Sequence, residues 1–442
     1  MSPINLQQLL YCLCYIPLIG SMFCLLFTYQ NIAFYIAIAC FSAILLALGV
    51  FLLFFFTSQN SLYLLDLNYL SNISSINIIF LLIITAIFLV ILLFYRHNIY
   101  KNLSEKQQSI FYALILINFF NIIGIITTHH LLKLYLFIEV YSLGCLAIIS
   151  FDNNKQIKQF NFDNFCFNVA SSILLLFAFL LIFIIFNDYN ITNYWQNLKF
   201  SHKSWLANLL FIIFIFAIII KFLPFWQYFY KLKTKSLLSK IFLIEGVFVK
   251  SLLAIFLSDK IINNVFGNHF SQSYFDVFLI ILGSILIFYS SFLSVKTQHF
   301  KLISLLLSLA TVGFLIILLG LNQYNLNYKS FVFWLLHLFF VNFIIFLFSD
   351  ILQNNAKTTK IWQLNFLKNH IFFKIIFFFL IIQLTFLPIT FSFLASWFLL
   401  IENLNSSAIS IIILSLAVYN LAQVIFANKL LNTILCLKNF KT

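Results

Sequence analysis

Long apolar runs separated by short polar stretches fill most of this sequence of 442 residues. A helix needs about 20 consecutive apolar residues to cross the hydrocarbon core of a membrane. The run 371–401 is too long for one straight span and contains Pro388, which predicts a broken helix there, because proline removes a backbone donor. The pattern as a whole predicts an all-α, polytopic membrane protein. Its thirteen expected transmembrane helices lie at residues 9–27, 31–56, 77–95, 110–128, 131–151, 164–186, 205–230, 237–258, 275–295, 300–320, 330–349, 371–401 and 407–428.

The composition excludes a soluble protein. Hydrophobic residues make up 63% of the chain and charged residues only 8%, and no soluble domain could bury that much apolar surface. The seven cysteines lie mostly inside apolar runs and form no CxxC pair. We therefore interpret them as packing residues and expect neither disulfides nor a metal site.

Lysine and arginine are distributed unequally between the two sides of the predicted membrane. Seventeen of the 25 fall in the C-terminal tail or in and beside loops after odd-numbered helices, and five fall in and beside loops after even-numbered helices. The other three, Lys221, Lys240 and Lys250, are assigned to the spans themselves. Because the inner side carries the basic excess, we expect the N-terminus outside and the C-terminus inside. This topology accounts for most of the net charge of +14, so we do not expect nucleic-acid binding.

Two of the four prolines lie in matching strings, Phe222-Leu223-Pro224 and Phe386-Leu387-Pro388. They fall in the seventh and twelfth predicted helices, five spans apart, which predicts two inverted five-helix repeats, each with a broken helix. Paired interrupted spans of this kind point to a transport pathway, although two such strings can also arise by chance in a chain rich in Phe and Leu. The expected organisation is three peripheral N-terminal helices (1–103), a first antiporter-like five-helix unit (104–262), a second (263–428) and a basic tail (429–442).

Ionisable residues inside the predicted spans are the candidate site. Glu139 and Lys221 lie near the middle of the fifth and seventh helices, and Glu245 and Lys250 lie inside the eighth. A lysine at bilayer depth is costly without a partner or a water-filled path. An acid and a lysine on neighbouring helices offset each other's desolvation, so we expect Glu139 and Lys221 within direct or one-water reach. The alternative is a closed ion-pair network that only holds helices together.

Two further residues have two interpretations each. His337 is central in the eleventh predicted helix and is either a hydrogen-bonded core histidine or a proton relay. Glu245 and Lys250 are five residues apart and do not share a helix face, so Glu245 either joins the relay or simply neutralises a neighbour.

Several strings between residues 110 and 428 carry a family resemblance through their order and spacing. They are His130-LLKLYLFIEVYSLGCLAIISF, Asn168-VASSILLLFAFLLIFIIFND, Lys221-FLPFW, Lys301-LISLLLSLATVGFLIILLG and Leu387-PITFSFLASWFLLIENL. Together they resemble subunit 2 of mitochondrial NADH:ubiquinone oxidoreductase (respiratory complex I), called subunit N in bacteria. The resemblance implies an antiporter-like fold, a share in proton pumping and no redox centre in this chain, with flavin and iron–sulfur clusters in partner subunits. It makes Glu139 and Lys221 the acid–lysine pair of the first half-channel and Lys250 the relay toward the centre.

The chain departs from the family pattern at three places. Gln227 and the residues after it replace the usual continuation of the seventh helix, Thr311 stands where relatives often carry histidine, and Ser396 takes the place of the lysine of the broken twelfth helix. We therefore expect a weakened relay in the second unit. Its exit runs either through His337 and ordered water toward Glu402, or through a neighbouring subunit.

The resemblance and the composition together predict the location. Residues with AT-rich codons, such as Phe (61) and Tyr (20), are abundant, whereas Gly (9) and Pro (4) are scarce. This is typical of an AT-rich organellar genome, although an AT-rich bacterium would look similar. We expect a multi-pass protein of the mitochondrial inner membrane, surrounded by other membrane-arm subunits and by lipids such as cardiolipin.

Other functions remain open from the sequence. Subunits 4 and 5 of complex I and cation/proton antiporter subunits share the expected fold. A secondary transporter would bind its own substrate at the two broken helices, but the residues near Pro388 include hydroxyls and no charge, which fits such a site poorly. A helix bundle that has lost pumping is the third alternative.

Overall fold

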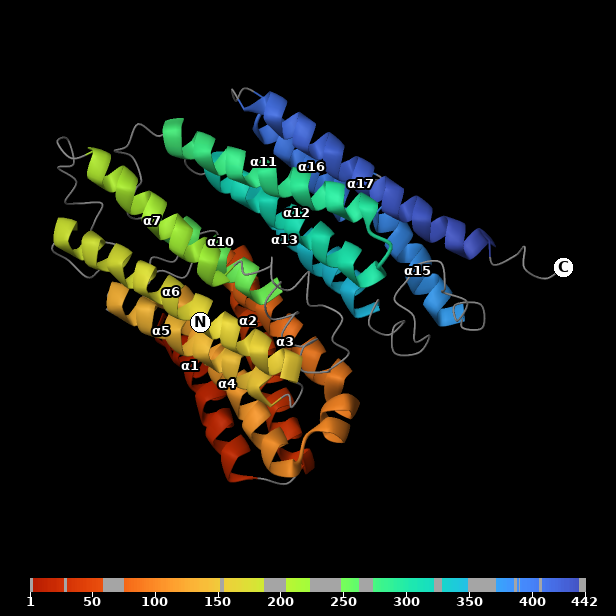
Figure 1. The fold of residues 1–442 in the computed structure, drawn as a ribbon. Coiled ribbons are helices and arrows are strands. Elements are labelled where there is room, and N and C mark those ends of the chain that lie inside the picture. The colour runs from red at the N-terminus through yellow and green to blue at the C-terminus, as the bar shows by residue number, and fades with distance from the viewer. Residues whose placement is uncertain are drawn as a thin grey trace. The chain divides into compact units, whose positions relative to one another are not determined.

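The structure is a computed structural model, and it describes residues 3–27, 30–58, 75–151, 155–186, 204–222, 248–261, 273–321, 328–348, 371–384, 388, 390–404 and 408–436. These ranges contain helices and no β-strand. The chain divides into two compact units, Met1–Phe270 and Ser271–Thr442 (Figure 1). The finer division into four regions stays a prediction.

The first unit is a bundle in which consecutive helices pack side by side. The first helices, α1, α2 and α4, pack against one another, and α4, α5, α6 and α7 then follow as a chain of neighbours, with α10 packed on α7 and α4 (Figure 1). Phe41 meets Phe88 and Phe119 in the core of the first four helices. The bounds are α1 Pro3–Leu26, α2 Gln30–Ser58, α3 Ser75–Asn102, α4 Glu105–Thr127, α5 Leu131–Ser150, α6 Lys155–Phe186, α7 Ser204–Phe222 and α10 Lys250–Ile261.

The second unit is built around the hairpin of α11 and α12. The two helices approach closely at Gly283 and Gly313, where a Cβ on either glycine would collide with the backbone of the facing helix. The long last helix, α17, packs along α11, and α13 packs against α16. The bounds are α11 Ser273–Lys296, α12 Phe300–Leu321, α13 Tyr328–His337, η4 Leu338–Phe343, α15 Ile371–Leu384, α16 Phe391–Glu402 and α17 Ile409–Cys436.

The described residues include nine helices that are long and apolar enough to cross a membrane. Shorter apolar helices, such as Ile212–Lys221 and Phe391–Glu402, accompany them. The protein is therefore a polytopic, α-helical membrane protein, as its hydrophobic pattern predicts. The count of thirteen and the inverted repeat stay predictions.

Several helices extend beyond the predicted spans. Helix α6 begins at Lys155 rather than at residue 164, and α17 ends at Cys436 rather than at 428. Polar residues can continue a helix after the apolar run ends, because the backbone bonds still form in water. The extension of α17 brings Lys429 to the end of α11. There its Nζ donates hydrogen bonds to the carbonyls of Val295 (2.5 Å) and Thr297 (3.2 Å).

The predicted break near Pro388 lies between two separate helices. Helix α15 ends at Leu384, α16 begins at Phe391, and Pro388 lies in a turn between them. The side chain of Gln383 accepts a hydrogen bond from the Phe391 amide at 3.3 Å, while the Ser392 hydroxyl donates to the Gln383 carbonyl at 3.2 Å. These bonds satisfy backbone groups that would otherwise have no hydrogen-bond partner at the break. Pro224, the site of the other predicted break, lies outside the described residues.

Candidate functional site

Three helices of the first unit bring one acid, one lysine and one serine together. Lys221 Nζ lies 2.5 Å from Glu139 Oε1 and 2.7 Å from Ser172 Oγ, to which it also donates. The Ser172 hydroxyl lies 2.8 Å from Glu139 Oε2 and 2.7 Å from the Asn168 carbonyl, and can donate to either. Glu139, Ser172 and Lys221 come from α5, α6 and α7, which pack in that order.

The two charged side chains are largely buried within the protein. The Lys221 side chain is 1% exposed, whereas the Glu139 side chain is 20% exposed. Removing charges from water costs several kcal/mol for each ion unless geometry and hydrogen bonds offset it. Here the lysine and the serine each engage one carboxylate oxygen. This arrangement keeps both charges inside an apolar helix bundle.

The predicted contact between Glu139 and Lys221 is confirmed. Ser172, by contrast, was not singled out from the sequence, although it lies within the Asn168 string. Serine in the middle of an apolar helix usually bonds the backbone one turn earlier, as the Ser172 hydroxyl can here. The sequence therefore offered no reason to prefer it over Ser171, whose hydroxyl donates to the same carbonyl of Asn168.

The lysine predicted to continue the relay is also buried. Lys250 is the first residue of α10, which packs against α7, and it is 3% exposed. Lys221 and Lys250 are the two buried lysines in the part of the chain that the structure describes. Glu245, the other predicted site residue of this region, lies outside the described residues.

A second polar cluster surrounds His337 in the second unit. His337 Nε2 lies 2.8 Å from the Tyr419 hydroxyl, and the Gln423 amide lies 2.8 Å from that hydroxyl and 3.2 Å from His337 Nε2. His337, Tyr419 and Gln423 are fully buried. A π-helical turn, Leu338–Phe343, follows His337 directly, and its Asn342 donates to Thr311 at 3.4 Å. Turns of this kind occur often at functional sites.

The partners of His337 define its tautomer. The Gln423 amide donates to both the Tyr419 oxygen and His337 Nε2, so the Tyr419 hydroxyl is the donor in its contact with the imidazole. Nε2 is then an acceptor, and Nδ1 carries the proton of a neutral ring. No partner of Nδ1 lies among the described residues. A buried polar group of this kind is commonly satisfied by ordered water.

Ser396, at the position of the family's lysine, is buried at 2% exposure and donates to the Phe393 carbonyl of its own helix at 2.7 Å. Thr390 and Ser392 lie 3.1 Å apart at the start of α16. Glu402 ends this helix, and its Oε2 has no partner among the described residues. Across those residues no group of three His, Cys, Asp or Glu side chains could hold a metal ion.

Residues 128–420 match the sequence model of the family described as NADH:quinone oxidoreductase/Mrp antiporter, TM. The matched segment is about two thirds of the 442 residues and includes Glu139, Lys221, Lys250 and His337. The chain belongs to this family. It is accordingly an antiporter-like membrane subunit of the type found in complex I and Mrp assemblies. The comparison with curated protein sequences finds no match.

Solved structures of multisubunit membrane complexes share the fold of this family member. A chain of the Mrp complex from Dietzia sp. DQ12-45-1b is 14% identical with a TM-score of 0.77, over 97% of this chain and 80% of that one. A chain of the archaeal membrane-bound sulfane sulfur reductase is 12% identical, with a TM-score of 0.70 and coverage of 97% and 88%. A chain of respiratory complex I from Thermus thermophilus is 13% identical, with a TM-score of 0.71 and coverage of 96% and 88%. At these identities the likeness is one of fold.

Proposed function

We propose that this chain is the subunit-2 type of antiporter-like subunit in a respiratory NADH:ubiquinone oxidoreductase, and that it carries protons across the membrane. The buried pair of Lys221 and Glu139 is the observation that carries the proposal. An ionisable residue at membrane depth is a functional candidate by default, and this pair lies within the segment that matches the family. The resemblance of the sequence around both residues to subunit 2 supports the finer assignment.

The proposed proton step starts at Glu139. When its carboxylate gains a proton, the ammonium of Lys221 loses its counter-charge, and an unbalanced buried charge is strongly unfavourable. Lys221 then releases its proton toward a neutral Lys250, with water bridging the gap. When Glu139 becomes a carboxylate again, it favours a new proton on Lys221. Ser172 contacts both the carboxylate and the amine and keeps them close together during the exchange. We assign to Glu245 the role of balancing the charge of Lys250.

The second unit has a different role in this proposal. Among the described residues of this unit, His337 is the one buried side chain that titrates near neutral pH when free in water, and its hydrogen bonds favour the neutral ring. We propose that it orders a water path rather than storing a charge. The outlet runs either from His337 toward Glu402 or through a neighbouring subunit.

The assembly and its location complete the proposal. We propose that the chain resides in the mitochondrial inner membrane, among other membrane-arm subunits and lipids such as cardiolipin, and that it does not bind nucleic acid. It holds no redox centre of its own, and flavin and iron–sulfur clusters belong to partner subunits.

A second candidate is a subunit of a cation/proton antiporter. The likeness of fold to a chain of the Mrp complex, with a TM-score of 0.77, favours it. In that case the pair of Glu139 and Lys221 exchanges protons against a metal cation, and no NADH oxidation accompanies transport. Purification of the native assembly separates the two, because only the first co-purifies with flavin, iron–sulfur clusters and NADH oxidation.

The decisive variant is Lys221→Met in the intact assembly in sealed membranes. We expect at least a tenfold loss of proton translocation, measured with a pH-sensitive dye, because the variant removes the group that stores the charge. NADH oxidation by the peripheral partner subunits, assayed with a soluble electron acceptor, should persist.

The matched control is Lys106→Met, which replaces an exposed lysine in the first turn of α4 and should leave translocation unchanged. Normal translocation by an assembled Lys221→Met complex would disprove the proposed relay.

A further inference from the structure

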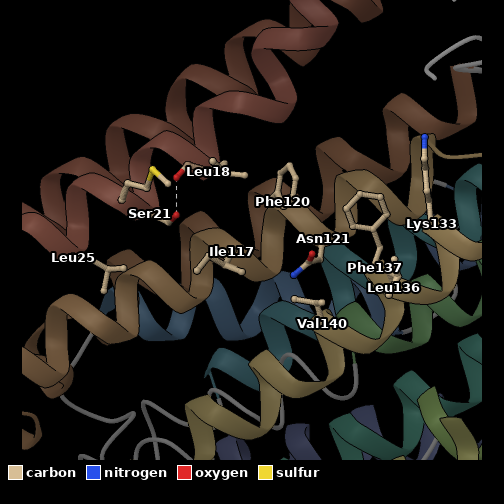
Figure 2. A pocket seen from close by; sticks show the side chains of 11 residues that line it. Leu18, Ser21, Leu25, Ile117, Phe120, Asn121, Lys133, Leu136, Phe137 and Val140 are labelled. Carbon is tan, nitrogen blue, oxygen red and sulfur yellow. Dashed lines mark hydrogen bonds between the residues drawn. The ribbon is translucent and has the colours of Figure 1, made fainter. Parts of the chain in front are cut away.

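A groove opens on the first unit where α1, α4 and α5 meet (Figure 2). Its volume is about 540 Å³, within the range of about 300–1,000 Å³ typical of small-molecule sites. Nearly all of its lining is apolar, from Leu18 and Leu25 on α1 to Phe120 on α4 and Leu136 and Val140 on α5. Helices α4 and α5 are long and apolar enough to cross a membrane, and α1 contributes the apolar segment Leu13–Leu26. We therefore expect the groove to face the hydrocarbon region.

The wall from α5 is an exposed apolar stripe. Leu132, Leu136, Val140 and Leu143 follow one another at helical spacing, and each is more than 40% exposed. In a membrane this stripe meets acyl chains or another protein. The groove therefore needs an apolar occupant over most of its length.

One end of the groove is basic. Lys133 lines it from the first turn of α5, and Figure 2 shows Lys133 at one end of the lining and Leu25 at the other. His129 and His130 lie in the turn just before this helix and are half-buried. Long basic side chains near a helix end extend toward the membrane interface. A negatively charged group at the interface therefore complements this end.

A polar side chain lies deeper in the same groove. Asn121 is 3% exposed, lines the groove, and its amide nitrogen has no hydrogen-bond partner among the described residues. It lies six residues before the end of α4, about 9 Å along the helix, whereas Lys133 is about 3 Å from the start of α5. An occupant that contacts both residues would place an anion beside the charge of Lys133 and a hydrogen-bond acceptor a few ångström deeper, beside the Asn121 amide.

We propose that this groove binds an anionic phospholipid. Its phosphate binds Lys133, an ester carbonyl accepts from the Asn121 amide, and one acyl chain runs between α1 and α5 toward Leu25. A helix of a partner subunit fits less well. With its side chains a helix is about 10–12 Å across, and it matches the basic end only if it carries an acidic residue at that depth. The proposal depends on the chain spanning a membrane and not on the transport function proposed above.

The test uses the intact assembly in nanodiscs that contain a trace of lipid with a photoactivatable acyl chain. The probes are phosphatidylglycerol and phosphatidylcholine carrying the same chain, and mass spectrometry identifies the labelled peptides. Phosphatidylglycerol should label peptides of α1, α4 and α5 in preference to phosphatidylcholine. Lys133→Ala should lower this labelling about fivefold, the effect of one interfacial lysine, while Lys133→Arg should retain it.

Two variants serve as controls. Lys106→Ala removes a lysine that does not line the groove and should leave labelling unchanged. Leu136→Trp fills the groove and should lower labelling by both lipids. Equal labelling by the two headgroups, or no effect of Lys133→Ala, would overturn the proposal. So would a partner-subunit helix cross-linked to cysteines placed in the groove.

Discussion

The two units stabilise their buried polar groups in different ways. In the first unit Lys221, Glu139 and Ser172 form a charged cluster in which each member touches the other two. In the second unit His337, Tyr419 and Gln423 form an equally close cluster of neutral groups. A charged cluster fails when one partner is lost, because the other charge remains buried. A neutral cluster loses only hydrogen bonds.

A local sequence match suggests how the difference arises. Thr128-x-His130 precedes α5 and Thr297-x-His299 precedes α12, and each histidine lies fourteen residues before a glycine, Gly144 or Gly313. In this register Ser308 falls at the position of Glu139. Its hydroxyl donates to the Leu305 carbonyl of its own helix. With a serine there and another at 396, these two buried positions of the second unit carry no charge that would need a counter-charge.

The largest effect we expect comes from separating the charges of the first unit. Lys221→Met alone leaves a carboxylate in the bundle, which should lower the free energy of unfolding by about 3 kcal/mol, the low end of the usual 3–5 kcal/mol because Glu139 is one-fifth exposed. The double variant Lys221→Met/Glu139→Gln should regain most of this stability but not translocation. Denaturant titration of the purified complex measures the stability of the single and the double variant, and the pH-sensitive dye measures their translocation. Additive losses in the double variant would show that the pair is not coupled.

His337→Phe should have a smaller effect on stability, about 1–2 kcal/mol, because it leaves the neutral partners Tyr419 and Gln423 with fewer hydrogen bonds. The same titration measures it, with Trp334→Phe as the comparison for aromatic packing beside the imidazole. A loss as large as that of Lys221→Met would mean that His337 carries a charge, and the contrast between the units would fail.

Ser172→Ala should cost about 1.5 kcal/mol, as expected for a hydrogen bond to charged groups, and should slow proton translocation severalfold. The neighbouring variant Ser171→Ala is a close control, since that hydroxyl donates only to the Asn168 carbonyl in the described structure. If both serine variants translocate protons equally well, Ser172 has no part in the charged cluster.

Ser396→Ala should have the smallest effect, below about 0.5 kcal/mol, because the Ser396 hydroxyl bonds only the Phe393 carbonyl among the described residues, within its own helix. Translocation should be unchanged if the outlet lies in a neighbouring subunit. Initial rates of dye response in sealed membranes provide the measurement. A clear loss would instead place the outlet along α16, toward Glu402.

The sequence alone determined the features that depend on composition and on position along the chain. Apolar runs of membrane length identified a polytopic helical protein, and Pro388 located the break between α15 and α16. Glu139 and Lys221 could be paired in advance, because buried charges are so costly that each needs a partner, and these two lie at similar depth on nearby spans.

Only the tertiary structure decided which neutral polar residues join these clusters. Serine, tyrosine and glutamine can be satisfied by their own helix, by water or by another helix, so Ser172, Tyr419 and Gln423 left no distinctive pattern in the sequence. The groove that Lys133 and Asn121 line also depends on how α1 packs beside α4 and α5. Burying an apolar face constrains helix packing only loosely. The partner that each polar side chain meets is set by the rotation and height of the helix that carries it.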